Sequence, residues 1–343
     1  MENFQTFAEP AANLVLNQVL IQSLNLTASQ QVVIDQGTLN QYQIQDYSGH
    51  QNKPELIAFA NELTAAQISA ISAIIAEQAS SQLLRVIRVN DSEQGIGLAW
   101  TLSADISEQQ KLQLVEFAAQ ANIEIWSAAQ RPQIQQPGLV LMDMDSTTIK
   151  IECIDEIAKL AGVGEEVAKV TELAMQGKLD FAESLRGRVA TLKNCPVEVL
   201  DTVANNLPLM HGLLRLIKVL KQNNWKVAIA SGGFTYFADK LKNDLGLDAA
   251  VANTLKIADG VLLGEVEGRI VDAQVKAETL QSLAQQFAIP HAQTIAMGDG
   301  ANDLTMMAAA ALGIAFEAKP IVQQKADVAI NNHGLDALLY LIS

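Results

Sequence analysis

Three short apolar segments, each ending in small polar or acidic residues, constrain the fold of this chain more than any other feature of its sequence. They are LVLMDMDST (139–147), KVAIASGG (226–233) and TIAMGDGAND (294–303). Runs of four or five apolar residues bounded by turn residues predict strands buried on both faces, as in a parallel sheet covered by helices. Open parallel sheets bind ligands beyond the carboxyl ends of their strands. The sequence thus predicts an α/β, doubly wound parallel-sheet core with an active site at that edge.

The size and composition of the chain indicate a folded protein of more than one domain. Its 343 residues suffice for two or three domains. A content of 49% apolar and 18% charged residues is typical of globular proteins rather than disordered ones. No segment approaches the roughly 18 apolar residues that a membrane helix needs, and the N-terminus lacks the features of a secretory signal. We therefore expect a cytoplasmic protein.

The two cysteines and the net charge restrict the kinds of site and partner. Cys153 and Cys195 are too few for a disulfide framework and lack metal-ligand spacing, so we interpret both as ordinary thiols in a reducing compartment. A formal net charge of -15 argues against nucleic acid and anionic membranes as partners. A phosphorylated small molecule remains compatible with this charge if local backbone amides, a few cations and a metal ion bind it.

A linker divides the chain into two domains. The segment RPQIQQPG (131–138) holds two prolines and a glycine directly before the first motif strand. We place the first domain at residues 1–135 and the second at 136–343. The first 50 residues give no assignable pattern, but those after them predict the order βαββαβ, which is the split ferredoxin-like arrangement of an α+β domain. This order resembles ACT-type regulatory modules by pattern alone. The predicted strands are 55–60, 83–90, 96–104 and 123–126, and the predicted helices are 64–78 and 108–120.

A helical insertion follows the first motif strand. About 75 residues separate this strand from KVAIASGG, and their pattern predicts four short helices. Helices inserted after the first strand of an α/β domain are typical of a lid over the active site. We expect this helical cap at about residues 153–212.

Asp143 and Asp145 supply the pair of acids that phosphoryl transfer uses. A carboxylate can attack phosphorus to give an aspartyl-phosphate, and a second acid two positions along can protonate the leaving group and later activate water. Two acids in a solvated turn would give the same motif in isolation. That interpretation leaves the motifs farther along the chain unexplained.

The other motifs supply groups that bind anions and metal ions. Asp299 and Asp303 lie on the glycine-rich turn GDGAND, and hard carboxylate oxygens suit Mg²⁺. Ser231 and Gly232 offer a hydroxyl and backbone amides at an expected helix start, which is an anion-binding geometry, although a plain N-cap would give the same motif. Lys276 would place a cation beside the phosphoryl group, although a lysine at a helix start is more often solvated.

The motifs DMDST, SGG, Lys276 and GDGAND, in this order and with a helical insertion after the first, resemble the haloacid dehalogenase superfamily of phosphotransferases. The resemblance covers roughly residues 136–343. The insertion, with ECIDEIAKLAGVGEEV and AMQGKLDFAESLRGRVATLK, further resembles the phosphoserine phosphatases, which release L-serine from O-phospho-L-serine in the last step of serine biosynthesis. Met144 stands where these enzymes often have an aromatic residue, a volume change that should not affect the chemistry.

The resemblance implies catalytic and metal-binding roles for five residues. Asp143 would be the nucleophile, Asp145 the general acid and base, and Lys276 a cation beside the nucleophile. Asp143, Asp299 and the main-chain carbonyl of Asp145 would bind Mg²⁺, with Asp303 behind them in a supporting position.

The resemblance also implies a binding site for the substrate. Glu152 would face the amino group of phosphoserine and Arg188 its carboxylate, and a bidentate arginine contact would orient the substrate as well as bind it. Met175 and Phe181 would form an apolar lid wall, although core packing explains them equally well. The residues implied to contact the phosphate are Ser231, Gly232, Lys276 and Asn302.

The sequence-based hypothesis is therefore an Mg²⁺-dependent phosphoserine phosphatase that acts through an aspartyl-phosphate. Transfer of the phosphoryl group from phosphoserine to another alcohol, such as homoserine, would use the same residues. A signalling receiver also uses paired acids and Mg²⁺ in a doubly wound sheet, but receivers lack a lid insertion and have no use for Glu152 and Arg188. For the first domain, serine sensing and formation of a homodimer are the two hypotheses.

Overall fold

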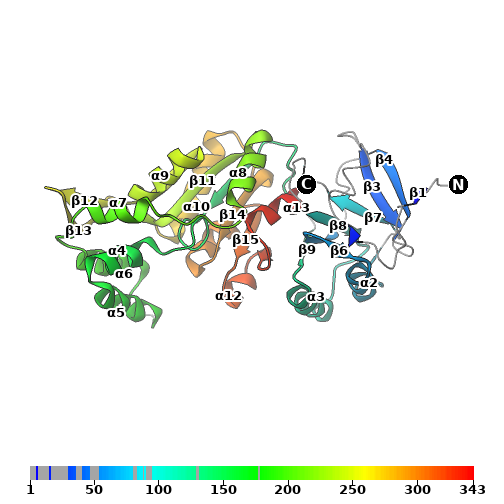
Figure 1. The fold of residues 1–343 in the computed structure, drawn as a ribbon, viewed down its shortest axis with the longest axis horizontal. Coiled ribbons are helices and arrows are strands. Elements are labelled where there is room, and N and C mark those ends of the chain that lie inside the picture. Colours follow the sequence, from blue (N-terminus) through cyan, green and yellow to red (C-terminus); the bar gives the residue numbers. More distant parts are fainter. Residues whose placement is uncertain are drawn as a thin grey trace. The chain divides into compact units, whose positions relative to one another are not determined.

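The structure of the protein is a computed structural model, shown in Figure 1. Contacts between residues divide the chain into two units, one of residues 1–135 with 330–343 and one of residues 136–329. Within the described part of the chain, we find no helix that combines the length and apolarity needed to span a bilayer. The residues described are 5–6, 15–16, 30–35, 41–46, 54–79, 83–87, 89, 95–128, 131–176 and 178–343.

The first unit contains, among its described residues, a seven-stranded sheet in the order β1-β4-β3-β7-β8-β5-β9. Every neighbouring pair of strands in this sheet is antiparallel. Helix α2 (Ala65–Ile74) lies between β5 and β7 in the chain and α3 (Glu108–Ala121) between β8 and β9, so the predicted order of elements is observed. The strands are β1 (Gln5–Thr6), β3 (Gln30–Asp35), β4 (Gln41–Asp46), β5 (Glu55–Ala60), β7 (Leu83–Ile87), β8 (Ile96–Thr101) and β9 (Glu124–Ala128), with β2 (Val15–Leu16) and β6 (Leu63–Thr64) in a separate pair.

Capping boxes begin both α2 and α3. The Thr64 hydroxyl accepts from the Gln67 main-chain N–H at 3.3 Å, and the Gln67 side chain accepts from the Thr64 N–H at 2.9 Å. Ser107 and Gln110 repeat this arrangement at the start of α3, and Asn122, in the left-handed conformation, caps its C-terminal end. Such boxes satisfy N–H groups that the first turn of a helix leaves free. The starts of both helices are therefore encoded in the local sequence.

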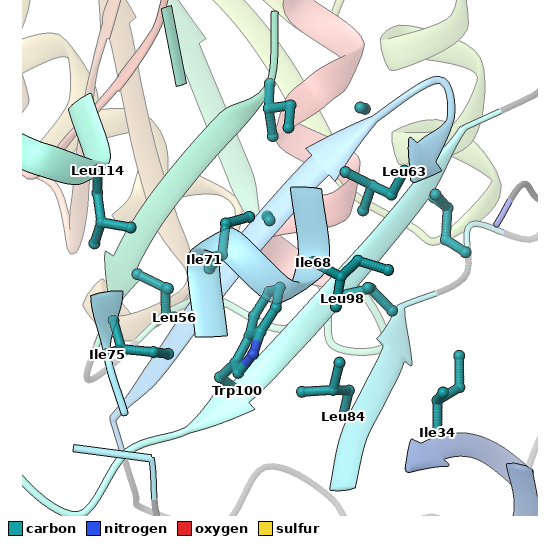
Figure 2. Close-up of a cluster of buried hydrophobic side chains, with 14 of the residues drawn as sticks. Ile34, Leu56, Leu63, Ile68, Ile71, Ile75, Leu84, Leu98, Trp100 and Leu114 are labelled. Carbon is teal, nitrogen blue, oxygen red and sulfur yellow. The ribbon is translucent and has the colours of Figure 1, made fainter. Parts of the chain in front are cut away.

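Side chains of α2 and α3 pack with those of the strands in one buried cluster (Figure 2). Ile68 and Ile71 of α2 and Leu114 of α3 belong to this cluster. Trp100 of β8 lies among them, and its indole N–H donates to Ser72 Oγ at 2.9 Å. Because a buried indole N–H needs a partner, this bond fixes the ring within the core. Further members are Ile34, Leu56, Leu63, Ile75, Leu84 and Leu98.

The C-terminal residues belong to the first unit, whereas the sequence analysis placed them in the second domain. Helix α13 (Leu338–Ile342) is buried along its whole length. The Tyr340 ring stacks on Phe59 of β5 with 4.0 Å between ring centroids. Residues this far apart in the sequence leave no local signal of their contact, so the pattern-based boundary was wrong for this segment.

Glu124 holds the chain that leads into α13. Its side chain on β9 is buried, with 3% of the residue exposed. One of its oxygens accepts the main-chain N–H groups of Asn331, Asn332 and His333 at 3.0, 2.6 and 3.0 Å. A buried carboxylate is costly unless it is hydrogen-bonded, and these three donors satisfy it.

The second unit is built on a sheet with the described strand order β13-β12-β11-β10-β14-β15-β16. The strands from β12 to β15 are parallel neighbours, and β13 is antiparallel to β12. All residues of β10 are buried, as expected for a strand covered on both faces. The predicted parallel α/β core is confirmed. The strands are β10 (Leu139–Met142), β11 (Lys226–Phe234), β12 (Ala249–Ala258), β13 (Val261–Glu267), β14 (Thr294–Gly298), β15 (Leu312–Phe316) and β16 (Val328–Ile330).

Helices flank this sheet. Leu280 and Leu283 of α10 and Met306 and Met307 of α11 pack with Leu141 and other strand residues in one buried cluster. Helices α8 and α9 contact β11. The flanking helices are α8 (Leu213–Gln222), α9 (Thr235–Leu245), α10 (Ala273–Gln286), α11 (Leu304–Ala308) and α12 (Pro320–Gln323), and the 3-10 turns of this unit are η2 (His291–Gln293) and η3 (Ala301–Asp303). The 3-10 turn η4 (Leu335–Ala337) belongs to the first unit.

A helical cap is inserted between β10 and α8, where the sequence predicts it (Figure 1). The two chain segments that join cap and core are hydrogen-bonded to each other. The Lys150 N–H donates to Pro208 O at 2.9 Å, and the Met210 N–H donates to Thr148 O at 2.9 Å. The cap helices are α4 (Cys153–Ala161), α5 (Gly164–Met175), α6 (Phe181–Thr191) and α7 (Glu198–Ala204).

We expect Glu124→Ala to lower the free energy of unfolding of the first unit by about 3 kcal/mol, because three N–H groups lose a charged acceptor. Urea unfolding followed by circular dichroism measures this change. Glu116→Ala, at an exposed position of α3, is the matched control and should change stability by less than about 0.5 kcal/mol. Equal stabilities of the two variants would contradict the role given to Glu124.

Candidate active site

The carboxyl ends of three neighbouring strands bring the motif residues together. Met142, the last residue of β10, pairs with Ile229 of β11 on one side and with Met297 of β14 on the other. Asp143 follows directly, and its N–H donates to Met297 O at 2.9 Å. This register places the ends of all three motif strands side by side at one edge of the sheet.

A buried group of three charges lies at this edge. Lys276 Nζ is 2.8 Å from Asp143 Oδ2 and 2.7 Å from Asp303 Oδ1, and the lysine side chain is only 1% exposed. Burial alone would lower the pKa of Lys276, but the two carboxylates outweigh burial and raise that pKa above its usual value. Lys276 therefore stays positively charged and is not the solvated lysine that a helix start more often carries.

Asp143, Asp299 and Asp303 form a carboxylate cluster in which an oxygen of each lies within 4.8 Å of the others. Both Asp303 oxygens are engaged, one by Lys276 at 2.7 Å and the other by the Gly300 N–H at 3.0 Å. Burial and the charge of Asp143 raise the pKa of both Asp299 and Asp303. Acids this close repel one another unless a cation lies among them, and their hard oxygens suit a divalent metal ion.

Asp145 lies in a poorly solvated position beside this cluster. Its Oδ1 is buried and has no hydrogen-bond partner among the described residues. Burial, followed by the negative charges of Glu152 and Asp143, raises the pKa of Asp145 well above its usual value. A carboxyl group whose pKa is raised toward neutrality can keep a proton and donate it, which is what a general acid needs.

The SGG segment is the bulged end of β11. The sequence pattern instead predicted that this segment begins a helix, and that prediction was wrong. Strand β11 continues to Phe234, and α9 begins at Thr235. The register between β11 and β12 shifts between Ala230 and Phe234. The Gly233 N–H donates to Ser231 Oγ at 2.9 Å, so the Ser231 hydroxyl keeps its own hydrogen for a ligand.

A cavity of about 240 Å³ opens in front of these groups. Cavities that hold drug-sized ligands measure about 300–1,000 Å³, so this one suits a smaller molecule. The predicted catalytic and substrate-binding residues line it, apart from Lys276, whose Nζ contacts Asp143 at the cavity wall. The core contributes Asp143, Asp145, Ser231, Gly232, Gly233, Phe234, Asp299 and Asn302, and the cap contributes Glu152, Ile154, Phe181, Leu185 and Arg188.

Arg188 and Glu152 give the cap side of the cavity two opposite charges. Arg188 Nε is buried and has no partner in the part of the chain that the structure describes. Burial lowers the pKa of Arg188, while Asp155 and Glu152 oppose this shift, and a guanidinium remains charged in proteins. Burial raises the pKa of Glu152, and a hydrogen bond from Ser146 Oγ at 2.8 Å opposes it. A buried N–H of a cation without a partner points to an anionic ligand.

Hydroxyl groups directly after the paired acids orient the site, although the sequence alone gave these residues no separate role. Thr147 Oγ1 donates to Asp299 Oδ1 at 3.1 Å. Thr148 Oγ1 donates to the Asp143 main-chain carbonyl at 2.5 Å. The only sequence signal of these roles, and of the bond from Ser146 to the cap acid, was their position next to the acids.

Phe181 of the cap packs against the SGG segment. A Cβ on Gly232 would lie 2.7 Å from Phe181 Cζ, so a glycine is needed there for the ring to approach. Met175 ends α5, but its side chain lies outside the described residues, and its place in the lid wall stays a prediction. Cys153 and Cys195 are buried and unpaired, as interpreted from the sequence.

Comparison with known proteins assigns this fold and site to a family. Residues 137–311, about half of the chain, match the haloacid dehalogenase-like hydrolase family. The chain belongs to that family. The carboxylate cluster of Asp143, Asp299 and Asp303 in this matched region has the donors to hold a divalent metal ion.

Relatives of this haloacid dehalogenase-like hydrolase include the phosphoserine phosphatase of Haemophilus influenzae. The two sequences are 55% identical over 229 residues, which are 67% of this chain and 73% of the relative. The crystal structure of a probable phosphoserine phosphatase from Vibrio cholerae, in an unliganded form, matches with a TM-score of 0.73 and 43% identity, over 86% of this chain and 88% of that chain. A substrate-bound phosphoserine phosphatase structure matches with a TM-score of 0.57 and 44% identity, over 61% of this chain and 99% of that chain.

We expect Lys276→Met to lower the stability of the metal-free protein by about 3–5 kcal/mol, because it leaves two buried carboxylates without their cation. Mg²⁺ should restore part of the loss by supplying positive charge among the same acids. Thermal unfolding in chelator and in Mg²⁺ measures both effects.

Lys256→Met is the control for this variant, because it breaks an exposed ion pair with Glu265 in the same unit. Exposed pairs contribute about 0–1 kcal/mol, so little change is expected. If Lys276→Met were as stable in chelator as Lys256→Met, the buried charges would not need the lysine.

Proposed function

We propose that this protein is a cytoplasmic phosphoserine phosphatase that hydrolyses O-phospho-L-serine to L-serine and phosphate through an aspartyl-phosphate, at the last step of serine biosynthesis. One observation carries the proposal. A single small cavity holds groups suited to phosphoryl transfer on its core side and groups suited to an amino-acid zwitterion on its cap side. The names of its relatives, and the substrate-bound phosphoserine phosphatase of similar fold, support the same activity.

The charges of the cavity match those of phosphoserine. The phosphoryl oxygens would contact the Ser231 hydroxyl, the Gly232 N–H, Lys276 and Asn302. The ammonium group would pair with Glu152, and the carboxylate would pair with Arg188, whose buried Nε has no partner among the described residues. A site that pairs each charge of its substrate rejects phosphate esters that lack those charges, because its own buried groups would remain unpaired.

In the first step, an Asp143 oxygen attacks phosphorus in line as the bond from phosphorus to the serine oxygen breaks. The departing oxygen takes the proton of Asp145, and the raised pKa of that carboxyl keeps the proton available. Lys276, 2.8 Å from Asp143 Oδ2, and the Ser231 hydroxyl stabilise the developing charge. L-Serine leaves, and Asp143 carries the phosphoryl group.

In the second step, Asp145 is a carboxylate and takes a proton from water as the water oxygen attacks phosphorus. The bond from phosphorus to Asp143 breaks, phosphate leaves, and Asp145 is protonated again. Ile154, Phe181 and Leu185 line the cap side of the cavity and exclude bulk water from both steps.

Asp143, Asp299 and the main-chain carbonyl of Asp145 would hold an Mg²⁺ ion, which when bound supplies positive charge to the phosphoryl oxygens. The Thr147 hydroxyl donates to Oδ1 of Asp299 and would orient this carboxylate in the metal site. Both oxygens of Asp303 are engaged, so Asp303 would orient Lys276 and support the metal site from behind.

Hydrolysis is a better account than transfer to a second alcohol such as homoserine. Relatives 55%, 57% and 52% identical to this chain are all named phosphoserine phosphatases. The helical cap between β10 and α8 also separates this fold from that of a signalling receiver, which has no such insertion.

Phosphate release from O-phospho-L-serine tests the proposal. We expect turnover that needs Mg²⁺, stops in excess chelator, and far exceeds that of O-phosphothreonine or an aryl phosphate. Asp143→Asn should lower kcat at least about 10,000-fold, as loss of a nucleophile does, with the thermal midpoint near that of the parent protein. Turnover of the aryl phosphate alone would contradict the substrate, and full activity of Asp143→Asn would contradict the mechanism.

We expect Arg188→Ala to raise KM for phosphoserine about 100-fold, because a bidentate contact between charged groups contributes roughly 3 kcal/mol or more. Turnover of an aryl phosphate should change only a few-fold, since that ester has no carboxylate. Arg186→Ala, at an exposed position of the same helix, is the matched control. If Arg188→Ala slowed both esters equally, Arg188 would be supporting the cap and not recognising the substrate.

For the first unit we propose an ACT-like role, either serine sensing or formation of a homodimer. Deleting residues 1–130 is a poor test, because α13 is buried within this unit and the deletion would expose it. L-Serine inhibition and sedimentation of the full chain provide a cleaner one. A non-competitive component of inhibition supports a serine site outside the cavity, and a mass twice that of one chain supports a dimer. Purely competitive inhibition of a monomer would contradict both roles.

A further inference from the structure

Asn253 of β12 is a buried amide to which the mechanism above gives no role. It is 1% exposed and lies on a largely apolar strand. Its Nδ2 donates to Gly232 O at 2.8 Å, and its Oδ1 accepts the Val271 N–H at 2.9 Å. A carbonyl can only accept and an N–H can only donate, so one orientation of the amide satisfies both partners. The side chain is therefore fixed at both ends by main-chain groups.

The bond to Gly232 fills a gap in the sheet. The register between β11 and β12 shifts between Ala230 and Phe234, so the main chain between them departs from the regular ladder. A buried carbonyl left without a donor would cost about 1–3 kcal/mol. The Asn253 side chain supplies the donor that the backbone of β12 does not provide at the bulge.

The orientation of the Gly232 carbonyl also sets the groups that face the phosphate. This carbonyl and the Gly233 N–H belong to one planar peptide. The Gly233 N–H donates to Ser231 Oγ at 2.9 Å, which leaves the Ser231 hydroxyl hydrogen for a ligand. Because Ser231 lines the cavity, fixing this peptide fixes the hydroxyl that faces the phosphate, and it restrains the adjoining peptide that carries the Gly232 N–H.

The bond to Val271 reaches a second element of the phosphate site. Val271 lies two residues before α10, which begins at Ala273 and carries Lys276 in its first turn. Lys276 is bonded to Asp143 at the end of β10. Asn253 thus connects the bulge of β11 to the segment that leads into the helix of the catalytic lysine.

We infer that Asn253 is a positioning residue for the phosphoryl group. It holds the peptide that orients Ser231 and Gly232 and ties that peptide to the start of the Lys276 helix. This inference rests on the proposed function, in which those groups contact the phosphoryl oxygens. Asn253 is not among the described residues that line the cavity, and it contacts neither Arg188 nor Glu152 in the hydrogen bonds described, so its effect is confined to the phosphate side.

Asn253→Asp tests the inference in the full chain saturated with Mg²⁺. An aspartate has nearly the shape of asparagine and still accepts from Val271, but as a carboxylate it does not donate to Gly232. We expect kcat/KM for phosphoserine to fall about 10- to 100-fold, and the inhibition constant of inorganic phosphate to rise by a similar factor. The inhibition constant of L-serine, which occupies only the amino-acid side, should stay within about twofold.

Leu255→Ala is the matched control, because Leu255 is a buried residue of the same strand, 7% exposed. It should lower the thermal midpoint and leave both inhibition constants unchanged. Inhibition constants do not depend on how much of a preparation is folded. A partly unfolded sample of the aspartate variant therefore still gives the inhibition constants of its folded fraction. If that variant yields no folded protein, Asn253→Ser, which is uncharged and smaller, takes its place with the same measurements.

Two results would overturn the inference. One is a folded Asn253 variant that binds inorganic phosphate as tightly as the parent protein. The other is an equal loss of phosphate and L-serine inhibition, which would show general damage to the site. Failure of the proposed function gives a different result, because the parent protein itself would then not hydrolyse phosphoserine. The binding of inorganic phosphate could still be compared between the parent protein and the Asn253 variants.

Discussion

The buried contact of Lys276 with Asp143 and Asp303 is the interaction on which the rest of the site depends. The Lys276 side chain is only 1% exposed, and burying a charged ammonium group is costly in free energy. The Asp143 and Asp303 carboxylates, 2.8 and 2.7 Å from Nζ, offset that cost. The three residues come from the end of β10, the first turn of α10 and the turn after β14. They meet only when the strands adopt the observed order, so the fold and the chemistry of the nucleophile are specified together.

The paired acids divide their roles because their surroundings differ. Asp143 has the ammonium group of Lys276 2.8 Å from its Oδ2, which orients the carboxylate and places a positive charge beside the nucleophile. Asp145 lies two residues away, where burial and the charge of Glu152 raise its pKa and favour the proton. Glu152 belongs to the cap, so the acid that would protonate the leaving group depends on cap and core together. This gives the cap an electrostatic part in the chemistry besides the exclusion of water.

The catalytic unit interrupts the first unit in the sequence. Residues 136–329 lie between the two segments that form the first unit, 1–135 and 330–343. Glu124 and Phe59 hold the second of these segments, through the main chain of residues 331–333 and the ring of Tyr340. The first unit is therefore complete only when both ends of the chain are present, which couples its stability to residues that follow the catalytic unit.

The sequence by itself determined the parallel core, the cap and the candidate catalytic residues, because each follows from a local pattern. Apolar runs that end in Asp143, Ser231 and Asp299 mark strands and their functional ends, and capping residues such as Ser107 mark helix starts. Only the tertiary structure decided that the SGG segment is a strand bulge, that Asn253 completes it, and that residues 330–343 join the first unit. These features depend on hydrogen bonds between residues distant in the chain, such as Glu124 with Asn331. A local sequence pattern does not identify the distant partner of such a bond.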